Sequence, residues 1–142
     1  TQVVDISAFS SSIDGTGVSF ALSGFFGGFS SQNDRAILVA RFLDGIGSFI
    51  SGVTIGDITA ANRGNVTGLL ADSTTSVVPL GARTVSLQLD MTRSSGAYND
   101  GYADNLSLVF TELSGVSGSV PEPASLAIFC LGLMGMKRRK AI

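Results

Sequence analysis

The chain contains no histidine, no tryptophan and a single cysteine among its 142 residues. That cysteine, Cys130, lies in an apolar run near the C-terminus. A Cys/His zinc site, a disulfide upstream of this run, and a thiol or serine–histidine nucleophile are therefore excluded. The acidic residues are almost all Asp in turn-like contexts such as Asp14-Gly15 and Asp44-Gly45, which favours turns over a glycosidase-like pair of carboxylates. We therefore expect that the protein is not an enzyme.

Positive charge is scarce outside the C-terminus. Residues 1–120 contain five Arg, no Lys and ten acidic residues, so the net charge of −2 for the whole chain hides a more acidic body. An acidic surface repels phosphate backbones, and nucleic-acid binding is therefore not expected. We expect the five Arg side chains to pair with the abundant Asp side chains, and contact with an acidic polymer is the alternative.

Before residue 120, apolar residues do not recur at the spacing of a helix over any long stretch. Instead, apolar and polar residues alternate in several segments. The clearest example is Arg83 to Met91, in which every second residue is apolar, as in a half-buried strand. Five further strands are predicted at residues 2–6, 18–23, 36–43, 49–55 and 106–110. The run from Ala36 to Leu43 is dense enough to be covered on both faces. Gly56 to Leu80 is the least regular stretch and is predicted to cross between two sheets. Short strands separated by Gly, Asp, Asn and Ser favour an all-β sandwich.

The C-terminal segment combines a Pro-Glu-Pro motif, an uncharged apolar run at residues 124–136 and a basic cluster. The motif is Pro121, Glu122 and Pro123, and the cluster is Lys137, Arg138, Arg139 and Lys140. The positive-inside rule places this end in the cytoplasm and the upstream chain across the membrane. As a helix the run would be about 20 Å long, short of a hydrocarbon core of about 30 Å. A buried amphipathic helix and an uncleaved anchor are the alternatives.

This order of parts resembles the PEP-CTERM sorting signal of bacterial surface proteins. The resemblance implies that an exosortase, a membrane protease, recognises Pro121, Glu122 and Pro123 and cuts near them. The upstream domain would then pass to the cell surface or extracellular matrix, with exopolysaccharide or biofilm as its surroundings. The anchoring by the short C-terminal helix would be transient.

The sequence S-G-A-Y-N-D-G-Y-A-D-N-L-S-L, from Ser95 to Leu108, resembles the galactose-binding-like jelly-roll domains that often precede such tails. The resemblance implies a jelly-roll-like β-sandwich over residues 1–114, a linker at 115–120 and the sorting signal at 121–142. It also implies a structural calcium ion at the start of the last strand, with Asp104 as the matched ligand and Asn99 and Asp100 as further candidates. Since neither a signal peptide nor a starting Met is present, we expect the chain to be the C-terminal part of a longer precursor, with a processed N-terminus as the alternative. The domains that it resembles also have strands ahead of the point at which this chain begins.

The same loop suits calcium by its chemistry, since calcium takes six to eight oxygen ligands. Asn99, Asp100, Asp104 and Asn105 supply carboxylate and amide oxygens within seven residues. Two Asx turns at the entrance of a strand would account for the same residues through local hydrogen bonds. Both interpretations stay open at this point.

Tyr98 and Tyr102 are candidates for a platform on which a sugar ring stacks. Alternatively, their rings pack against the sheet.

The leading hypothesis for the function is a non-enzymatic protein of the surface or matrix. A carbohydrate-binding module is the first alternative. The second is a self-assembling subunit of a filament or matrix, in which a neighbouring strand covers an unpaired sheet edge.

Overall fold

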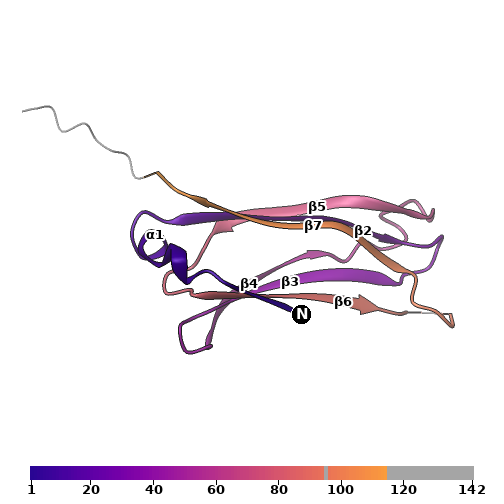
Figure 1. Ribbon diagram of the computed structural model, residues 1–142. Helices are drawn as coiled ribbons and strands as arrows, with labels where there is room; N and C mark the ends of the chain where they lie inside the picture. Colours follow the sequence, from indigo (N-terminus) through magenta and orange to yellow (C-terminus); the bar gives the residue numbers. More distant parts are fainter. Residues whose placement is uncertain (95, 115–142) are drawn as a thin grey trace, which may run out of the picture.

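The computed structural model describes residues 1–94 and 96–114, which form two antiparallel sheets packed face to face (Figure 1). The elements are β1 (Gln2–Asp5), η1 (Ser7–Phe9), α1 (Ser10–Asp14), β2 (Val18–Gly28), β3 (Arg35–Leu43), β4 (Phe49–Gly56), β5 (Gly68–Val77), β6 (Thr84–Thr92) and β7 (Gly101–Glu112). Sheet A has the strand order β1-β6-β3-β4, and sheet B has the order β5-β2-β7. The predicted all-β sandwich is thus confirmed. The predicted linker, C-terminal helix and basic cluster lie outside the described residues.

The six strands predicted from alternation are all present, but β5 is a seventh strand that the sequence did not reveal. It lies inside the stretch from Gly56 to Leu80, and it pairs with β2 over ten positions, from Gly28 opposite Gly68 to Ser19 opposite Val77. As an edge strand it is largely exposed, so it carries polar residues on both faces and shows no apolar alternation. The predicted crossing between sheets is correct, because β4 belongs to sheet A and β5 to sheet B.

The core lies between β2 and β3, whose alternate side chains point toward one another. The buried hydrophobic residues of these two strands are Val18, Phe20, Leu22, Phe26, Ala36, Leu38, Ala40 and Phe42. The rings of Phe20 and Phe42 lie 5.0 Å apart between centroids and hold the two sheets together. The opposite face of β3 is only half-buried at Ile37 and Val39. The expectation that this strand is covered on both faces was therefore wrong.

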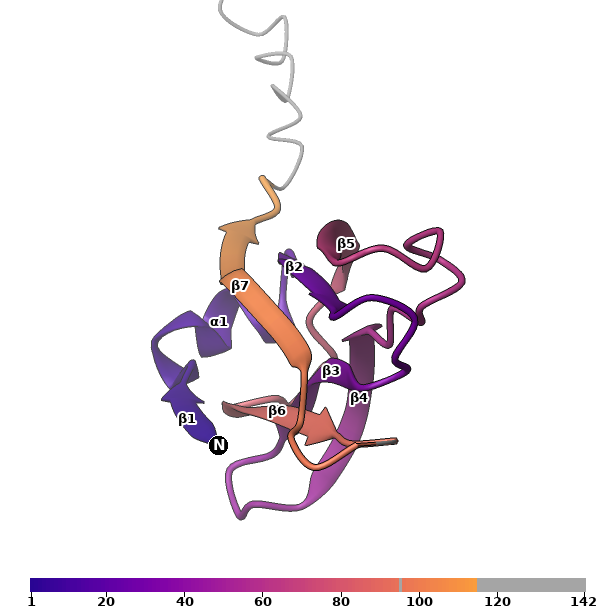
Figure 2. The same cartoon turned by 90° about the vertical axis from the view of Figure 1, so that its right-hand side faces the viewer.

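A short helical segment closes one end of the sandwich. Elements η1 and α1 connect β1 in sheet A to β2 in sheet B, and Figure 2 shows α1 between the ends of β1 and β7. The ring of Phe9 contacts that of Phe110, with centroids 6.2 Å apart, and Ile13 is fully buried. The Ser12 hydroxyl donates a hydrogen bond to Glu112 Oε1 at 2.6 Å. These contacts fix the last residues of β7 at the end of the sandwich that α1 closes.

An ion pair between Asp14 and Arg83 joins the end of α1 to the start of β6. The hydrogen bond from the Arg83 guanidinium lowers the pKa of the Asp14 carboxyl below its ordinary value of 3.8, and the Gly81 N–H adds to this effect at 3.0 Å. Because the pKa is lowered in the folded state, the stabilisation is present above pH 3.8 and is lost as the pH falls through the folded-state pKa.

We predict that Arg83→Met raises the pKa of Asp14 toward its ordinary value, since methionine keeps the length of the side chain but donates no hydrogen bond. Carboxyl carbon shifts measured by NMR across acid pH would follow the titration. Asp5 is the internal control, because its pKa is lowered by hydrogen bonds from Ser7 and not by Arg83. An unchanged Asp14 titration in the variant would contradict the assigned cause.

Candidate functional site

The end of the sandwich opposite α1 gathers three loops. These are the loops between β2 and β3, between β4 and β5, and between β6 and β7, all at the right-hand end of the molecule in Figure 1. This end contains Asp34 and Arg63, the two charged side chains that are buried among the described residues. Burial of a charge is costly unless hydrogen bonds compensate for it, so the surroundings of these two side chains define the site.

The Asp34 carboxylate has no solvent exposure and holds the loop between β6 and β7. Its Oδ1 accepts hydrogen bonds from the Ser94 N–H at 2.6 Å and the Ser94 hydroxyl at 3.0 Å. Its Oδ2 accepts a hydrogen bond from the Asp100 N–H at 2.9 Å. The loop is therefore fixed at both of its ends by one carboxylate from the start of β3.

Arg63 is 5% exposed, and its guanidinium group donates hydrogen bonds to backbone carbonyl groups. Its Nη1 donates to the carbonyl oxygens of Gly28 at 2.8 Å and Ser30 at 3.1 Å, and also to that of Val66. Its Nη2 donates to the Gln32 carbonyl oxygen at 2.9 Å. Arg63 thereby ties the loop between β4 and β5 to the loop between β2 and β3. The expected pairing with Asp holds for Arg35 with Asp57 and for Arg83 with Asp14. The other three Arg side chains have different partners, because Arg63 donates to backbone carbonyl groups, Arg41 to Gln88 Oε1 and Arg93 to the Ala97 carbonyl oxygen.

The predicted calcium ligands are spread along the entrance to β7. Asn99 Nδ2 donates to the Met91 carbonyl oxygen, and Asn99 Oδ1 accepts from the Gly101 N–H, both at 3.0 Å. Asn99 thus forms the Asx turn that was the alternative interpretation. Asp104 lies on the exposed face of β7, opposite Phe25 of β2, about 13 Å along the extended chain from Asp100.

In residues 1–94 and 96–114, no three side chains of His, Cys, Asp or Glu form a group able to hold a metal ion. Calcium binding by Asn99, Asp100 and Asp104 stays a prediction from sequence.

The two tyrosines lie in different parts of the chain, one in a loop and one in a strand. Tyr98 lies in the loop before β7 with 79% of its surface exposed. Tyr102 lies within β7 opposite Gly27, on the outer face of sheet B, where Phe25 is also partly exposed. Tyr98 therefore belongs to the loop end, whereas Tyr102 belongs to a flat sheet surface. Sugar stacking on these tyrosines stays a prediction.

A polar depression of about 430 Å³ lies at the loop end and is lined by residues that include Asn33, Arg35, Thr59 and Asn65. Some of these polar side chains already have partners within the protein. Arg35 forms an ion pair with Asp57 at 2.9 Å, and Asn33 Oδ1 accepts a hydrogen bond from the Ala60 N–H. Among the described residues, no Asp or Glu lines the depression. Its residues thus offer hydrogen bonds to a ligand but no carboxylate for acid–base chemistry.

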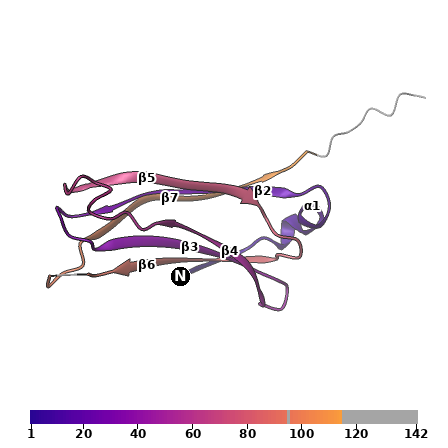
Figure 3. The ribbon, with the colours of Figure 1, turned by 180° about the vertical axis from the view of Figure 1, so that it is seen from behind.

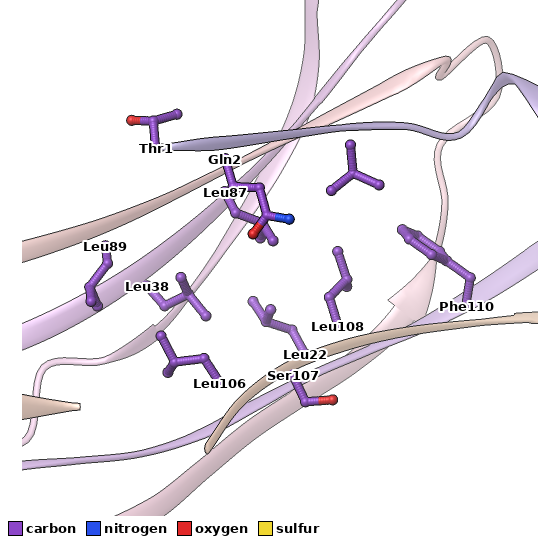
Figure 4. A pocket seen from close by; sticks show the side chains of 11 residues that line it. Thr1, Gln2, Leu22, Leu38, Leu87, Leu89, Leu106, Ser107, Leu108 and Phe110 are labelled. Carbon is purple, nitrogen blue, oxygen red and sulfur yellow. The ribbon is translucent and has the colours of Figure 1, made fainter. Parts of the chain in front are cut away.

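A second and larger cavity is an apolar cleft of about 520 Å³ between the two sheets (Figure 4). Side chains from five strands line it, among them Leu22, Leu38, Leu87, Leu106 and Leu108. Figure 4 shows these side chains pointing into the same space. The cleft is suited to binding apolar groups rather than to catalysing a reaction.

Asp34, Arg63 and the apolar cleft were not anticipated from the sequence. Asp34 lies in the sequence Q-N-D-R and Arg63 lies in A-N-R-G-N, and both sequences are typical of turns. The one local signal was the unusual density of Asn, Asp and Gly around them.

Comparison with known protein families identifies one segment. Residues 119–141 match the PEP-CTERM protein-sorting motif, and no curated protein matches the chain. The match includes Pro121, Glu122 and Pro123 and the basic cluster, and it leaves the β-sandwich unassigned. Within the part of the chain that the structure describes, no helix is long and apolar enough to cross a membrane. The chain carries a PEP-CTERM sorting motif after its β-sandwich, which indicates an exported protein that is sorted to the cell surface and processed by an exosortase.

Proposed function

We propose that this protein is a non-enzymatic component of the cell surface or extracellular matrix, delivered there by an exosortase. The observation that carries the proposal is the sorting motif at residues 119–141, which follows the last strand of the sandwich after a few residues. The motif gives the chain a route to the surface, and the sandwich is the part that remains after the motif is removed.

The composition of the sandwich supports a structural role. It contains no His and no Cys, so metal sites and nucleophiles built from these residues are unavailable to it. The two charged side chains that are buried in its described part, Asp34 and Arg63, bind backbone and hydroxyl groups of neighbouring loops and thus stabilise the fold. An acidic, loop-rich sandwich without these groups suits retention in exopolysaccharide or a biofilm better than turnover of a substrate.

The apolar run at residues 124–136 and the basic cluster provide a transient anchor in this proposal. The cluster stays in the cytoplasm, the run enters the bilayer, and the cut near Pro121, Glu122 and Pro123 separates both from the sandwich. Since the run is short for a bilayer, its flanking Lys and Arg side chains would extend toward the interface.

The proposal predicts a longer, membrane-bound form in a host that lacks its exosortase. Pulse-labelled protein would be followed by gel mobility in membrane and matrix fractions. Conversion to the shorter form should fall at least about tenfold, because the PEP motif is what the protease reads. Replacing Pro121, Glu122 and Pro123 together with Ala in the normal host should have the same effect.

Pro79→Ala is the matched control, since it removes a proline from the loop before β6 and leaves the sorting motif intact. Its processing should equal that of the unmodified chain. Equal conversion with and without the exosortase would refute the sorting route. Conversion followed by complete loss to the culture medium would refute retention in the matrix.

A further inference from the structure

The last strand of the sandwich ends on the side that α1 closes. Strand β7 ends at Glu112, opposite Val18, and the Leu113 N–H donates a hydrogen bond to the Gly17 carbonyl oxygen at 3.0 Å. Figure 3, which shows the molecule from behind, has the end of β7 at the right, together with α1 and the loops between β3 and β4 and between β5 and β6. The sorting motif begins at residue 119, a few residues further along the chain. We refer to this side as the tail end of the sandwich.

Two loops of the tail end have an exposed apolar side chain at their tips. Ile46, between β3 and β4, is 89% exposed, and Leu80, between β5 and β6, is 71% exposed. Phe49, at the start of β4, is exposed as well. Turns favour Gly, Pro, Asn, Asp and Ser, and neither tip side chain belongs to the buried core. The packing of the fold therefore gives no reason for apolar side chains at these two tips.

The loop that presents Ile46 has its backbone donors satisfied internally. Asp44 Oδ1 accepts hydrogen bonds from the Ile46 N–H at 3.0 Å and from the Ser48 N–H at 2.7 Å. The Gly47 N–H donates to the Asp44 carbonyl oxygen at 3.1 Å. Backbone groups that are already paired can approach the apolar part of a bilayer without the cost of losing water as a partner.

The loop that presents Leu80 is held in a similar way. The Gly81 N–H donates to Asp14 Oδ1 at 3.0 Å, and the Ala82 N–H donates to the Pro79 carbonyl oxygen at 3.2 Å. Proline has no backbone N–H to satisfy. Both tips are thus presented by turns whose hydrogen bonds lie within the protein.

A series of hydrogen bonds joins the two loops to the end of β7. The Arg83 N–H donates to the Leu43 carbonyl oxygen at 2.8 Å, so the loop with Leu80 lies beside the loop with Ile46. The Val78 N–H donates to the Val18 carbonyl oxygen at 2.8 Å, and Val18 lies opposite Glu112 of β7. The two tips and the last residues of β7 therefore belong to one end surface.

The acidic side chains of the tail end already have hydrogen-bond donors within the protein. In the described residues they are Asp5, Asp14, Asp44 and Glu112, whose donors include Ser7, Arg83, Ile46 and Ser12, respectively. A carboxylate that must lose water without a replacement opposes contact with an apolar surface. The internal hydrogen bonds of these four side chains reduce that opposition.

The sorting tail decides which surface the tail end meets. Exposed apolar side chains also occur at the opposite end, as at Val66 and Tyr98, so exposure alone does not identify a partner. Nine residues, 115–123, separate the described part of β7 and its flank from the apolar run, and they span at most about 30 Å. While the run is in the bilayer, the tail end is therefore held close to the lipid, where weak apolar contacts can form.

We propose that the tail end docks on the surface of the lipid bilayer, with Ile46 and Leu80 inserted at the level of the lipid headgroups, for as long as the C-terminal run anchors the chain. This inference rests on the sorting route proposed above. Apolar side chains gain free energy when they move from water to the boundary between headgroups and acyl chains. Two separate protruding side chains suit a fluid lipid surface, which adapts to their shape. The opposite end, with Asp34 and Arg63, then points away from the membrane.

The test uses the absence of Trp from the chain, because a single introduced Trp then reports its own surroundings. Ile46→Trp and Leu80→Trp would be made in the full 142-residue chain, which is placed in nanodiscs of phosphatidylcholine. Val66→Trp, in the loop between β4 and β5 at the opposite end, is the matched control. Bromine atoms on the acyl chains close to the headgroups quench Trp only at short range. They should lower the emission at positions 46 and 80 at least about twofold and leave that at position 66 unchanged.

A second comparison allows for the membrane affinity of the introduced Trp itself. In the Leu80→Trp chain, the further change Ile46→Ser should recover at least about half of the quenched emission, because docking loses one of its two apolar tips. Val66→Ser in the same chain is the control and should leave the quenching as it was.

Equal quenching at positions 46, 80 and 66, or unchanged quenching after Ile46→Ser, would overturn the proposal. A blue-shifted emission at positions 46 and 80 that bromine does not quench would also overturn it, since the chain's own residues would then cover the tips. A chain that does not co-purify with nanodiscs would refute the membrane anchor and this inference together. Co-purification with unquenched tips would refute the docking alone.

Discussion

Replacing Asp34 with alanine is expected to lower the free energy of unfolding by about 3 kcal/mol, because it removes a buried carboxylate that accepts three hydrogen bonds. The carboxylate accepts hydrogen bonds from the Ser94 N–H, the Ser94 hydroxyl and the Asp100 N–H. Alanine provides no acceptor, and the fully buried position gives water little access to replace one. The measurement is urea denaturation followed by far-UV circular dichroism.

Two further variants separate burial from hydrogen bonding. Asp44→Ala removes a carboxylate that accepts hydrogen bonds from the Ile46 and Ser48 N–H groups in an exposed turn, and it should cost about 1 kcal/mol or less because water can replace it. Asp34→Asn keeps one acceptor oxygen and should give an intermediate loss. If Asp34→Ala and Asp44→Ala cost the same, the Asp34 carboxylate does not hold the two ends of the loop from within the fold.

Strands that contribute to the core were predictable from sequence, and the edge strand β5 was not. Phe20 and Leu22 alternate with the small residues Ser19, Ala21 and Ser23, because one face of β2 is buried and the other is only half-buried. In β5 the inward positions are themselves polar, as at Asp72 and Thr74, since they close the side of the sandwich next to β4. Alternation reports burial, so a strand that buries little on either face gives no signal.

The buried charges of the loop end were missed for a related reason. Asp34 meets Ser94 and Asp100 across separations of 60 and 66 residues, and nothing in its immediate neighbourhood distinguishes it from an ordinary turn aspartate. Burial of a charged group is decided by distant parts of the chain. Asn99, in contrast, forms an Asx turn with Gly101, two residues away, and this local pattern was one of the two interpretations that the sequence offered.

The sorting motif was recognisable for the opposite reason. Its information lies in the order of a tripeptide, an apolar run and a basic cluster within residues 119–141, and it needs no distant contact. The apolar cleft required the structure, since Leu87 and Leu106 belong to different sheets. The alternation predicted that each would point inward but could not show that the space between them stays open.

Gly27→Ala is expected to destabilise the fold by about 3 kcal/mol, because a methyl group at this position would meet the neighbouring strand. An ideal Cβ at Gly27 would lie 1.9 Å from the Gly68 carbonyl oxygen and 3.1 Å from the Leu69 Cα, both in the backbone of β5. Backbone atoms cannot rotate away as a side chain does. The strands β2 and β5 would have to separate locally and lose ladder hydrogen bonds.

Gly68→Ala is the matched control, since it makes the same substitution at the adjoining position of β5 and its Cβ would meet nothing within 4 Å. We expect its free energy of unfolding to stay within about 0.5 kcal/mol of that of the unmodified chain. Both variants restrict the unfolded chain equally, so the difference between their urea midpoints isolates the contact in the folded state. Equal midpoints would mean that β2 and β5 can tolerate a side chain between them, and that the glycine at position 27 does not set their spacing.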